Sequence, residues 1–397
     1  SYVFANMLQL NVIIVGAGVG GLVAALCCAR KGYSVRILEQ TGGEDLGAGI
    51  QLSPNCTRVL HDLGFASELE RHGCLPEAIE IRDWQTGHLI SSKVLGESIR
   101  RGTGYPYYHM SRTDLSQLLR DKVEEEPRIQ MHCDTRVDDF EQQAGKVQVS
   151  SGEEKFEGDV LLGADGLHST IKDKLLGSTR PRFTGNLAWR ATFPAAQLPP
   201  GLISPVAALW WGPKKHFVFY PIAGGELVNC VGVVEKTVWQ DESWMTHGEP
   251  GELRQDFAGW HKDIEVLIDH MDSSNCYKWA LYDREPLAHW SVGQATLLGD
   301  ACHPTLPFLA QGAAMAIEDA AVLAICLHKA MSVEEALQHY EALRMDRTAR
   351  VQAESRRNGR IFHMSGIVAK MRNLVASTAI ANRFDWIYGY DPMSVSK

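Results

Sequence analysis

The chain has 397 residues, of which 45% are hydrophobic and 22% are charged. This composition can bury a large core divided among roughly two to three domains. The net charge of −9 argues against nucleic acid as the main partner, because binding to phosphates requires a basic face. The 9 cysteines are scattered along the chain and do not resemble a disulfide framework, so we expect a reducing compartment and a cytoplasmic protein.

The first apolar stretch, residues 12–29, contains no charged residue and on length alone is a candidate for a membrane span. Four glycines in its first half favour a strand, a turn and a helix instead. Residues 1–9 lack the basic and small-residue features of a signal peptide, and the last three residues are not a peroxisomal signal. We therefore expect no integral membrane segment.

The glycines form a G-x-G-x-x-G motif between a predicted strand and a predicted helix. A β-branched run at 11–15 leads into Gly16-Ala-Gly18-Val-Gly-Gly21 and an Ala/Leu-rich helical stretch at 22–30, and a second predicted strand ends at Glu39. In such a unit the first glycine permits the tight turn, the second lets a pyrophosphate approach the backbone, and the third allows close helix packing. The helix N-terminus attracts phosphate, and the acid is placed to bind the adenosine ribose. The unit predicts a dinucleotide, either NAD or FAD.

Two later segments repeat the form of a strand followed by a loop. Residues 159–163 predict a strand that leads to Asp165-Gly166, with Ser169 near the cap of the next helix. Residues 295–299 predict another strand that ends at Asp300. The chain then passes Pro307 and Gln311-Gly312-Ala313 before a helix expected at 315–331.

In order and spacing, the three segments resemble the signatures of the single-component (group A) FAD-dependent aromatic hydroxylases. The resemblance is strongest to the branch of salicylate hydroxylase and 6-hydroxynicotinate 3-monooxygenase, and it extends from residue 11 to about residue 321. It implies an α/β fold in which a Rossmann-like FAD-binding domain holds an inserted antiparallel-sheet substrate domain and is followed by C-terminal helices. We place the FAD-binding domain and helical tail at 1–75, 105–180 and 286–397, and the substrate domain at 76–104 and 181–285.

The resemblance also assigns cofactor contacts. Asp300 would bind the ribityl hydroxyls, Arg112 the ribityl and phosphate region, and the loop 47–51 would run along the flavin ring. Asp165 would handle flavin and pyridine nucleotide, and the helix after Gln311 would stabilise negative charge on the reduced ring through its N-terminus. The expected FAD-binding residues are Gly16, Gly18, Gly21, Glu39, Gly49, Ile50, Arg112, Val137, Asp165, Asp300, Pro307, Gln311, Gly312 and Ala313.

Some positions depart from the family or allow another interpretation. Lys172 stands where the family usually has arginine, which weakens a nicotinamide-nucleotide role there, and Ala314 stands where many relatives have asparagine. Without the resemblance, Arg112 is equally compatible with a surface ion pair, and a helix cap is the less favoured alternative for Asp300. Cys302-His303 offers a metal pair, but adjacent residues rarely chelate one ion and no second pair has zinc-like spacing, so we expect no metal.

The middle of the chain changes to short strands separated by turns. Strands are expected at 186–194, 206–212, 216–222 and 227–235, with hairpin turns at 212–215 and 223–225, and a piece at 79–93 is expected to join them. Together these strands would form an antiparallel sheet over a planar ring.

Alternation along 216–220 places His216, Val218 and Tyr220 on one face, with the two polar side chains about 13 Å apart at the backbone. The His-x-x-x-Tyr-Pro spacing resembles the same branch of the family, in which this pair contacts substrate. The expected catalytic residues are Tyr220 and His216, as proton acceptor or relay, and Arg190, whose guanidinium suits a carboxylate or phenolate. The alternatives are a packed aromatic strand for the pair and a sheet-edge salt bridge for Arg190.

The resemblance implies a flavoprotein monooxygenase. NADH or NADPH would reduce FAD, O2 would add at C4a, and the resulting C4a-hydroperoxyflavin would hydroxylate a small aromatic substrate, a phenol or an aromatic acid. No second G-x-G-x-x-G is present, so the nicotinamide nucleotide is expected as a transient co-substrate. An epoxidase, an FAD oxidase or reductase without oxygen insertion, and a non-enzymatic binding module remain alternatives, whereas the Trp-x-Trp-x-Ile-Pro signature of halogenases is absent.

The chain after residue 331 is predicted to be helical, at 333–350 and again at 367–381. The second helix is amphipathic and is expected to pack on the FAD-binding domain, with a membrane surface or a dimer partner as alternatives. We expect a monomer or a homodimer.

Overall fold

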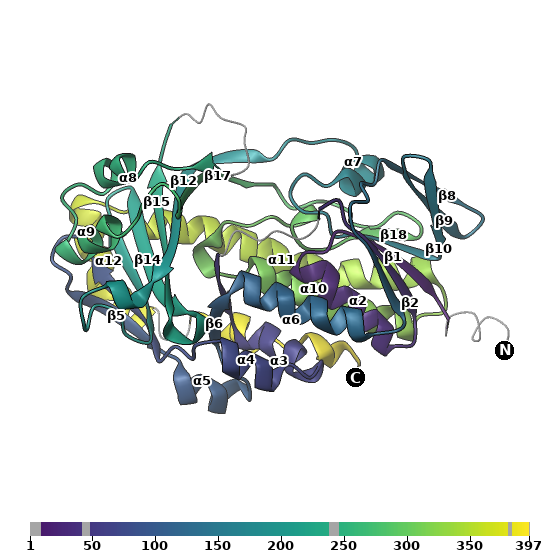
Figure 1. Cartoon of the computed structure of the whole chain (residues 1–397), viewed down its shortest axis with the longest axis horizontal. Helices are drawn as coiled ribbons and strands as arrows, with labels where there is room; N and C mark the ends of the chain where they lie inside the picture. Colours follow the sequence, from purple (N-terminus) through teal and green to yellow (C-terminus); the bar gives the residue numbers. More distant parts are fainter. Residues whose placement is uncertain (1–8, 42–47, 238–245, 380–382, 397) are drawn as a thin grey trace.

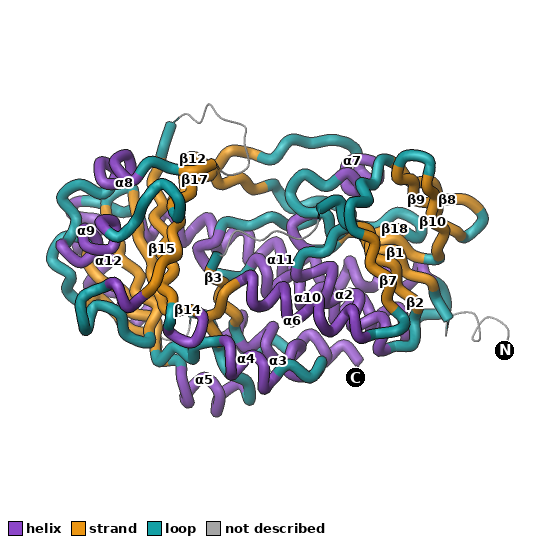
Figure 2. The backbone as a smooth tube through the Cα atoms, in the orientation of Figure 1, coloured by secondary structure: helices purple, strands orange, loops and turns teal. Residues whose placement is uncertain are grey.

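Two large sheets lie at opposite ends of the molecule, and long helices fill the space between them (Figures 1 and 2). The computed structural model describes residues 9–41, 48–237, 246–379 and 383–396. The expected α/β class, with a parallel sheet, a second sheet made from the middle of the chain, and C-terminal helices, is confirmed.

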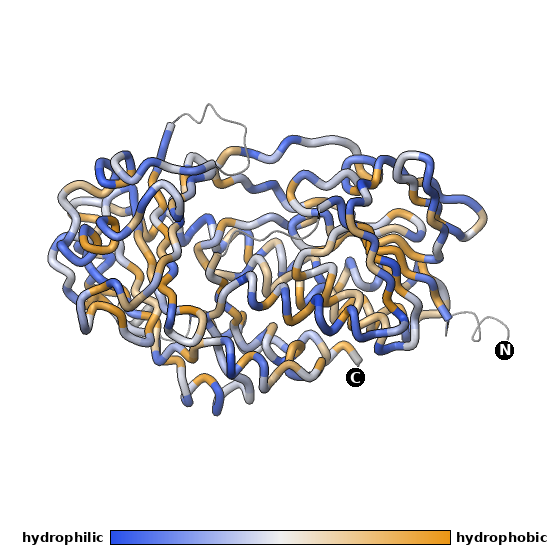
Figure 3. Tube along the Cα trace, in the orientation of Figure 1, coloured by the Kyte–Doolittle hydropathy of each residue, from blue (hydrophilic) through white to orange (hydrophobic). Residues whose placement is uncertain are grey.

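The first sheet has five strands, and every neighbouring pair is parallel. Its order is β18 (Ala295–Leu297), β11 (Val160–Gly163), β1 (Asn11–Val15), β2 (Ser34–Leu38) and β7 (Ile129–His132). The three central strands, β11, β1 and β2, are short apolar runs that are mostly buried, as expected for parallel strands covered on both faces. Figure 3 shows hydrophobic residues gathered along this sheet, beside the more hydrophilic turns of a three-stranded sheet at the edge of the molecule.

Helices α2 (Val19–Arg30) and α10 (Gly312–Lys329) pack against each other beside the parallel sheet. A Cβ atom on Gly20 would lie 2.9 Å from the Cβ of Ala316, so this glycine is what permits the close approach. The strand, turn and helix expected at 12–29 are therefore confirmed. Within the described part of the chain, no helix combines the length and the apolar character needed to cross a membrane.

The second sheet has eight strands and contains all four strands expected from the middle of the chain. Its order is β16 (Thr246–His247), β17 (Cys276–Asp283), β12 (Arg182–Pro194), β15 (Leu227–Glu235), β14 (Lys215–Ile222), β13 (Val206–Gly212), β4 (Ala78–Asp83) and β5 (Leu89–Val94). The piece at 79–93 joins the sheet as predicted, but β4 runs parallel to β13, so the sheet is mixed. More than a hundred residues separate these two strands, and no hairpin fixes their direction.

One face of the eight-stranded sheet is covered by α8 (Pro250–Asp256) and α9 (Lys262–Asp269). Aromatic side chains fill the space beneath these helices, including Trp189, Phe217, Phe257 and Trp260. The sheet therefore buries one face in its own core and turns the other toward the rest of the molecule.

The remaining elements connect the two sheets or cap them. The strands are β3 (Gly49–Leu52), β6 (Tyr108–Ser111), β8 (Asp139–Gln143), β9 (Lys146–Ser151) and β10 (Glu154–Gly158), and the helices are α3 (Pro54–Asp62), α4 (Ala66–His72), α5 (Gly96–Thr103), α6 (Arg112–Glu125), α7 (Thr170–Leu176) and α13 (Asp385–Tyr388).

The C-terminal helices differ from expectation in two ways. Helix α11 (Val333–Phe362) continues twelve residues beyond the predicted end at 350. Helix α12 (Gly366–Ala379) packs on β5 through its small residue Ala376, whereas its large apolar residues are exposed: Ile367, Val368, Met371, Leu374 and Val375. These residues form one stripe of the helix, and because α12 packs on β5 of the eight-stranded sheet, the prediction that this helix packs on the FAD-binding domain is wrong. Ala381, the predicted end, lies outside the described residues.

Candidate active site

A cavity of about 460 Å³ lies between the two sheets. One wall is made of loops at the carboxyl ends of the parallel strands and the start of α10, and it includes Gly18, Asp300 and Gly312. The other wall is the inward face of the eight-stranded sheet, and it includes Arg190, His216 and Tyr220. The three predicted catalytic residues and several of the predicted cofactor residues thus line one cavity.

The glycine-rich turn after β1 has the geometry of a phosphate cradle. Gly16 has φ +109, and a Cβ there would lie 2.1 Å from the carbonyl oxygen of Ala164. A Cβ on Gly21 would lie 2.1 Å from the carbonyl oxygen of Gly16. Gly18 differs, because nothing lies within 4 Å of its Cβ position and it lines the cavity. The first and last glycines are thus required by the fold, while the middle one leaves space for a ligand.

Glu39 and Val137 lie outside the lining of this cavity. The Glu39 carboxylate accepts hydrogen bonds from the backbone N–H of Ala17 at 2.5 Å and of Thr41 at 3.2 Å, which ties the end of β2 to the glycine turn. Val137 is buried in the core of the parallel-sheet region. The adenosine-ribose contact assigned to Glu39 and the FAD contact assigned to Val137 stay predictions.

Asp300 and Arg112 are the two oppositely charged side chains of the cofactor wall that line the cavity. Asp300 follows β18 on a short 3₁₀ turn and its side chain is open to the cavity. Burial by the surrounding protein raises the pKa of Asp300, while His303 and Arg112 oppose the rise. Arg112 begins α6, and its backbone N–H donates to the carbonyl of Ala48 at 2.7 Å. An acceptor and a guanidinium at these positions suit the hydroxyls and phosphates of a flavin nucleotide.

The loop at 48–51 and the segment at 307–313 complete this wall. Gly49, Ile50, Pro307, Gly312 and Ala313 all line the cavity. Gly49 also packs on Asn229, whose Oδ1 accepts from its backbone N–H at 3.0 Å. Gly47, the first residue of the predicted loop, lies outside the described residues.

Two predicted cofactor residues turn their side chains elsewhere. Asp165 accepts hydrogen bonds from the Ser169 hydroxyl and from the backbone N–H of Ile171, the latter at 3.2 Å, so it holds the start of α7. Gln311 is buried and bonds to Ser53 and Asn55, each at 2.9 Å. Neither side chain lines the cavity, although their neighbours do, so any contact with flavin would come from the backbone around them.

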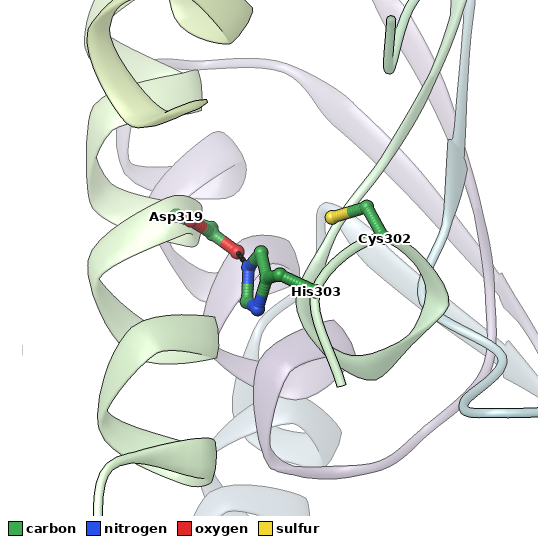
Figure 4. A group of neighbouring side chains, drawn as sticks. All are labelled: Cys302, His303 and Asp319. Carbon is green, nitrogen blue, oxygen red and sulfur yellow. Dashed lines mark hydrogen bonds and ion pairs between the residues drawn. The ribbon is translucent and has the colours of Figure 1, made fainter. Parts of the chain in front are cut away.

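Cys302, His303 and Asp319 form the group of potential metal ligands that the sequence pair Cys302-His303 suggested. Figure 4 shows the His303 ring directed at Asp319 on α10, with Cys302 beside it. The second carboxylate oxygen of Asp319 accepts from Arg344 Nε at 2.6 Å, and burial raises the pKa of the Cys302 thiol well above its ordinary value. The Asp319 carboxylate is thus already neutralised by the Arg344 guanidinium. This favours a structural ion-pair cluster that anchors α10, rather than a metal site.

The substrate-side wall has the predicted alternation. His216, Val218 and Tyr220 all line the cavity from β14. Arg190, on β12, also lines it, and its guanidinium lies 5.4 Å from the ring centroid of Trp279 and 5.9 Å from that of Tyr277. Aromatic rings therefore flank a cation that faces the cavity.

Burial has opposite consequences for the two polar residues of β14. The pKa of His216 is lowered well below its ordinary value by burial and by the neighbouring His363, so its imidazole is neutral and can accept a proton. Burial raises the pKa of Tyr220, while Asn229, Arg112 and Arg190 act in the other direction, so its hydroxyl stays protonated and can donate a hydrogen bond. The Tyr220 ring lies against His109, with ring centroids 4.3 Å apart.

Trp279, His109 and His363, with the contacts that they make in or beside the site, were missed by sequence reasoning. Trp279 could be found only from the pairing of β12, the strand that carries Arg190, with β17. This pairing places Trp279 opposite Ala188, two residues before Arg190. His109 and Gln51 meet because β6 pairs with β3, and His109 Nε2 lies 3.2 Å from Gln51 Oε1. His363 lies 147 residues from its hydrogen-bond partner His216, and no local pattern connects them.

The residues present fit FAD: a glycine turn with space at Gly18, an acceptor at Asp300 and a helix N-terminus at Gly312 line one cavity. A family described as FAD binding domain matches residues 9–355. The chain is 37% identical to 3-amino-4-hydroxybenzoate 2-monooxygenase of Streptomyces platensis, covering 97% of both chains, and 37% identical to 6-hydroxynicotinate 3-monooxygenase of Pseudomonas fluorescens, covering 88% of this chain and 91% of that one.

A third relative, 3-hydroxybenzoate 6-hydroxylase of Polaromonas naphthalenivorans, is 35% identical and covers 97% of both chains. Among solved structures, HpxO of Klebsiella pneumoniae complexed with FAD and uric acid has a TM-score of 0.84 at 25% identity, covering 98% of this chain and 96% of that one. The resemblance inferred from the three motifs is thereby confirmed, and the chain belongs to the family of FAD-binding proteins that includes these aromatic-ring monooxygenases.

Proposed function

We propose that this protein uses FAD, O2 and NADH or NADPH to hydroxylate a small aromatic acid that carries a ring hydroxyl. The observation that supports this most is the single cavity shared by the cofactor wall and by Arg190, His216 and Tyr220. The relatives named above support the substrate class, because each of the three names contains a benzoate or nicotinate with a hydroxyl group.

Bound FAD supplies the redox chemistry, which takes two electrons from the nicotinamide nucleotide and inserts one atom of O2 into the ring. The chain's own residues hold the cofactor: the turn at Gly18 and Arg112 would bind its phosphates, Asp300 its ribityl hydroxyls, and the N-terminus of α10 the negative charge of its reduced ring. FAD binding itself follows from the family, while the individual contacts are part of the proposal.

On the opposite wall, Arg190 would bind the substrate carboxylate through its planar guanidinium. His216 would accept the proton of the ring hydroxyl, because a phenolate ring is a better nucleophile than a phenol ring. Tyr220 would donate a hydrogen bond that fixes the ring, and Phe308 and Trp279, which also line the cavity, would keep water away. A cavity face with these three polar residues suits a phenolic acid better than a hydrocarbon alkene, which disfavours the epoxidase alternative.

The test is a screen of the FAD-loaded protein with hydroxybenzoates, aminohydroxybenzoates and hydroxynicotinates. We expect at least one of them to stimulate oxidation of NADH or NADPH and to gain one oxygen atom in its product mass. Nucleotide oxidation that yields only H2O2 with every aromatic acid would reject the hydroxylase and favour an oxidase. Using NADH and NADPH in parallel reactions also identifies the co-substrate.

A further inference from the structure

A chain of three hydrogen-bonded side chains leads from the cavity wall to the surface. His216 Nδ1 lies 2.7 Å from His363 Nε2, and His363 Nδ1 lies 2.9 Å from Glu235 Oε1. His216 and His363 are buried, with side-chain exposure of only 3% for His363, whereas the side chain of Glu235 is 44% exposed. The three residues come from β14, the end of α11 and β15, so separate elements hold the chain together.

The carboxylate determines the direction of every hydrogen bond in this chain. Because ionised Glu235 can only accept, His363 must donate through Nδ1, which leaves its Nε2 as an acceptor. His216 must then donate to His363 through Nδ1, so the free lone pair of His216 is on Nε2. That nitrogen has no hydrogen-bond partner among the described residues, and His216 lines the cavity. We assign the tautomers on this basis.

We propose that His216, His363 and Glu235 form a proton relay that carries the ring-hydroxyl proton of the substrate from the cavity to solvent. The inference rests on the proposed function, and it adds His363 and Glu235 as positioning and proton-carrying residues. In the relay the substrate O–H bond breaks and His216 Nε2 gains the proton. The Nδ1 proton of His216 moves to His363 Nε2, and the Nδ1 proton of His363 moves to Glu235, which releases it to water.

No electron is transferred in these steps, and the atoms balance because three protons each move by one position and the last of them then passes from Glu235 to water. When a proton returns to the product hydroxyl, the same steps run in reverse and restore the starting tautomers. The hydrogen-bonded chain lies among aromatic rings: Phe308 and Phe362 meet the His216 ring edge-on, at centroid distances of 5.0 Å and 5.3 Å. These rings separate the histidines from water, so the carboxylate is the exit.

The charges around the relay keep Glu235 ionised, so that it accepts the hydrogen bond from His363 and releases a transferred proton to water instead of retaining it. The hydrogen bond from His363 lowers the pKa of Glu235, burial opposes this shift, and Lys214, in the turn between β13 and β14, adds to it. On the side of α12, Arg372 donates to the carbonyls of Ile361 and Phe362 at 2.8 Å and 3.2 Å. A buried His216 cannot retain a positive charge next to His363, so a proton that it accepts must be passed on.

The test uses Glu235→Gln and His363→Gln in the FAD-loaded protein, with the aromatic acid that gives product in the screen. We expect normal FAD content and substrate KM, with kcat at pH 6 lowered roughly 100-fold for His363→Gln and roughly tenfold for Glu235→Gln. The variants can hydroxylate only substrate whose ring hydroxyl is already ionised. Their kcat should therefore increase about tenfold for each unit by which the pH is raised, until the pH reaches the pKa of that hydroxyl. The wild-type kcat should change much less over the same range.

Matched controls are Glu252→Gln and His270→Gln, which lie on the helices that cover the other face of the same sheet. Glu252 is 43% exposed and pairs with Lys278 at 3.1 Å, and His270 bonds to the backbone of Val266. Both controls should keep the wild-type pH profile. Because Glu235 is exposed, Glu235→Gln tests the relay even if His363→Gln does not fold. A wild-type pH profile in folded Glu235→Gln would overturn the relay, whereas absence of product from the wild-type protein would reject the proposed function itself.

Discussion

The two walls of the cavity are built on different principles. The cofactor wall consists mainly of backbone, with glycine turns and the start of a helix after parallel strands, and its few side chains include Asp300 and Arg112. The substrate wall consists of side chains that project from every second position of antiparallel strands. Backbone suits a cofactor that is the same throughout a family, whereas alternating side chains can change without disturbing the sheet. Mutations in the cofactor wall should therefore impair folding or FAD binding, whereas mutations in the substrate wall should impair substrate binding or product yield.

The largest effect is expected in the glycine turn. Gly16→Ala requires a Cβ at 2.1 Å from a backbone oxygen and a non-glycine residue at φ +109, so we expect it to destabilise the protein by more than about 3 kcal/mol. Gly18→Ala meets no atom within 4 Å and should fold normally but bind FAD 10- to 100-fold more weakly. Thermal unfolding and FAD titration distinguish the two outcomes. Tight FAD binding by Gly18→Ala would show that the cofactor does not approach this turn.

On the substrate wall, Arg190→Gln should fold and retain FAD, because Arg190 belongs to a strand surface and not to the cofactor turn. Loss of a charge-assisted pair to a substrate carboxylate is expected to cost about 3 kcal/mol and to raise KM roughly 100-fold. The control is the primary amide of the same substrate, which should bind the variant and the wild-type protein similarly. An unchanged KM for the acid would show that a group other than Arg190 binds the substrate carboxylate.

Between the walls, His109 should make stability depend on pH. Burial lowers its pKa to about 3 from an ordinary 6.5, so only the unfolded state takes up the proton between these values. Its contribution to stability is complete above pH 6.5 and falls as the pH drops, by about 2 kcal/mol from pH 7 to pH 5. Urea unfolding of His109→Phe should show a weaker loss over this range, because His216 still contributes in the same direction. The exposed His247→Phe is the control, and an unchanged pH dependence in His109→Phe would contradict the assignment.

The smallest expected effect is at Tyr220. Tyr220→Phe removes one hydroxyl and keeps the ring that packs on His109, so FAD and substrate should still bind. Loss of one hydrogen bond to the reacting ring should lower the yield of hydroxylated product per NAD(P)H about tenfold, with the remaining reducing equivalents appearing as H2O2. Product yield equal to that of the wild-type protein would remove Tyr220 from the reaction.

Sequence patterns predicted the cofactor wall well, because its motif depends on local backbone geometry. The bounds of β1 agree with expectation to the residue, and Gly18 and Asp300 line the cavity. The directions of side chains were less predictable, as Asp165 and Gln311 show. Both are polar residues that follow strands or begin helices, and whether such a residue faces a ligand or a neighbouring helix depends on packing from distant parts of the chain.

The least predictable features depend on contacts between remote segments. The pairing of His216 with His363 needs α11 to extend to residue 362, twelve residues past its predicted end. The parallel pairing of β4 with β13 has no hairpin signal. The apolar pattern of α12 correctly predicts a helix. It does not predict which side of that helix packs on the rest of the protein and which side is exposed.

The order of strands in the parallel sheet has a consequence for how the protein is made. Strand β11 needs β18 as its neighbour, and α2 needs α10, but the ribosome synthesises β18 and α10 only after the whole run from β12 to β17. During that interval the growing chain holds a sheet with an open edge and a helix with a bare apolar side, both of which promote aggregation. We therefore expect nascent chains of this protein to depend on chaperones until the segment after residue 330 emerges.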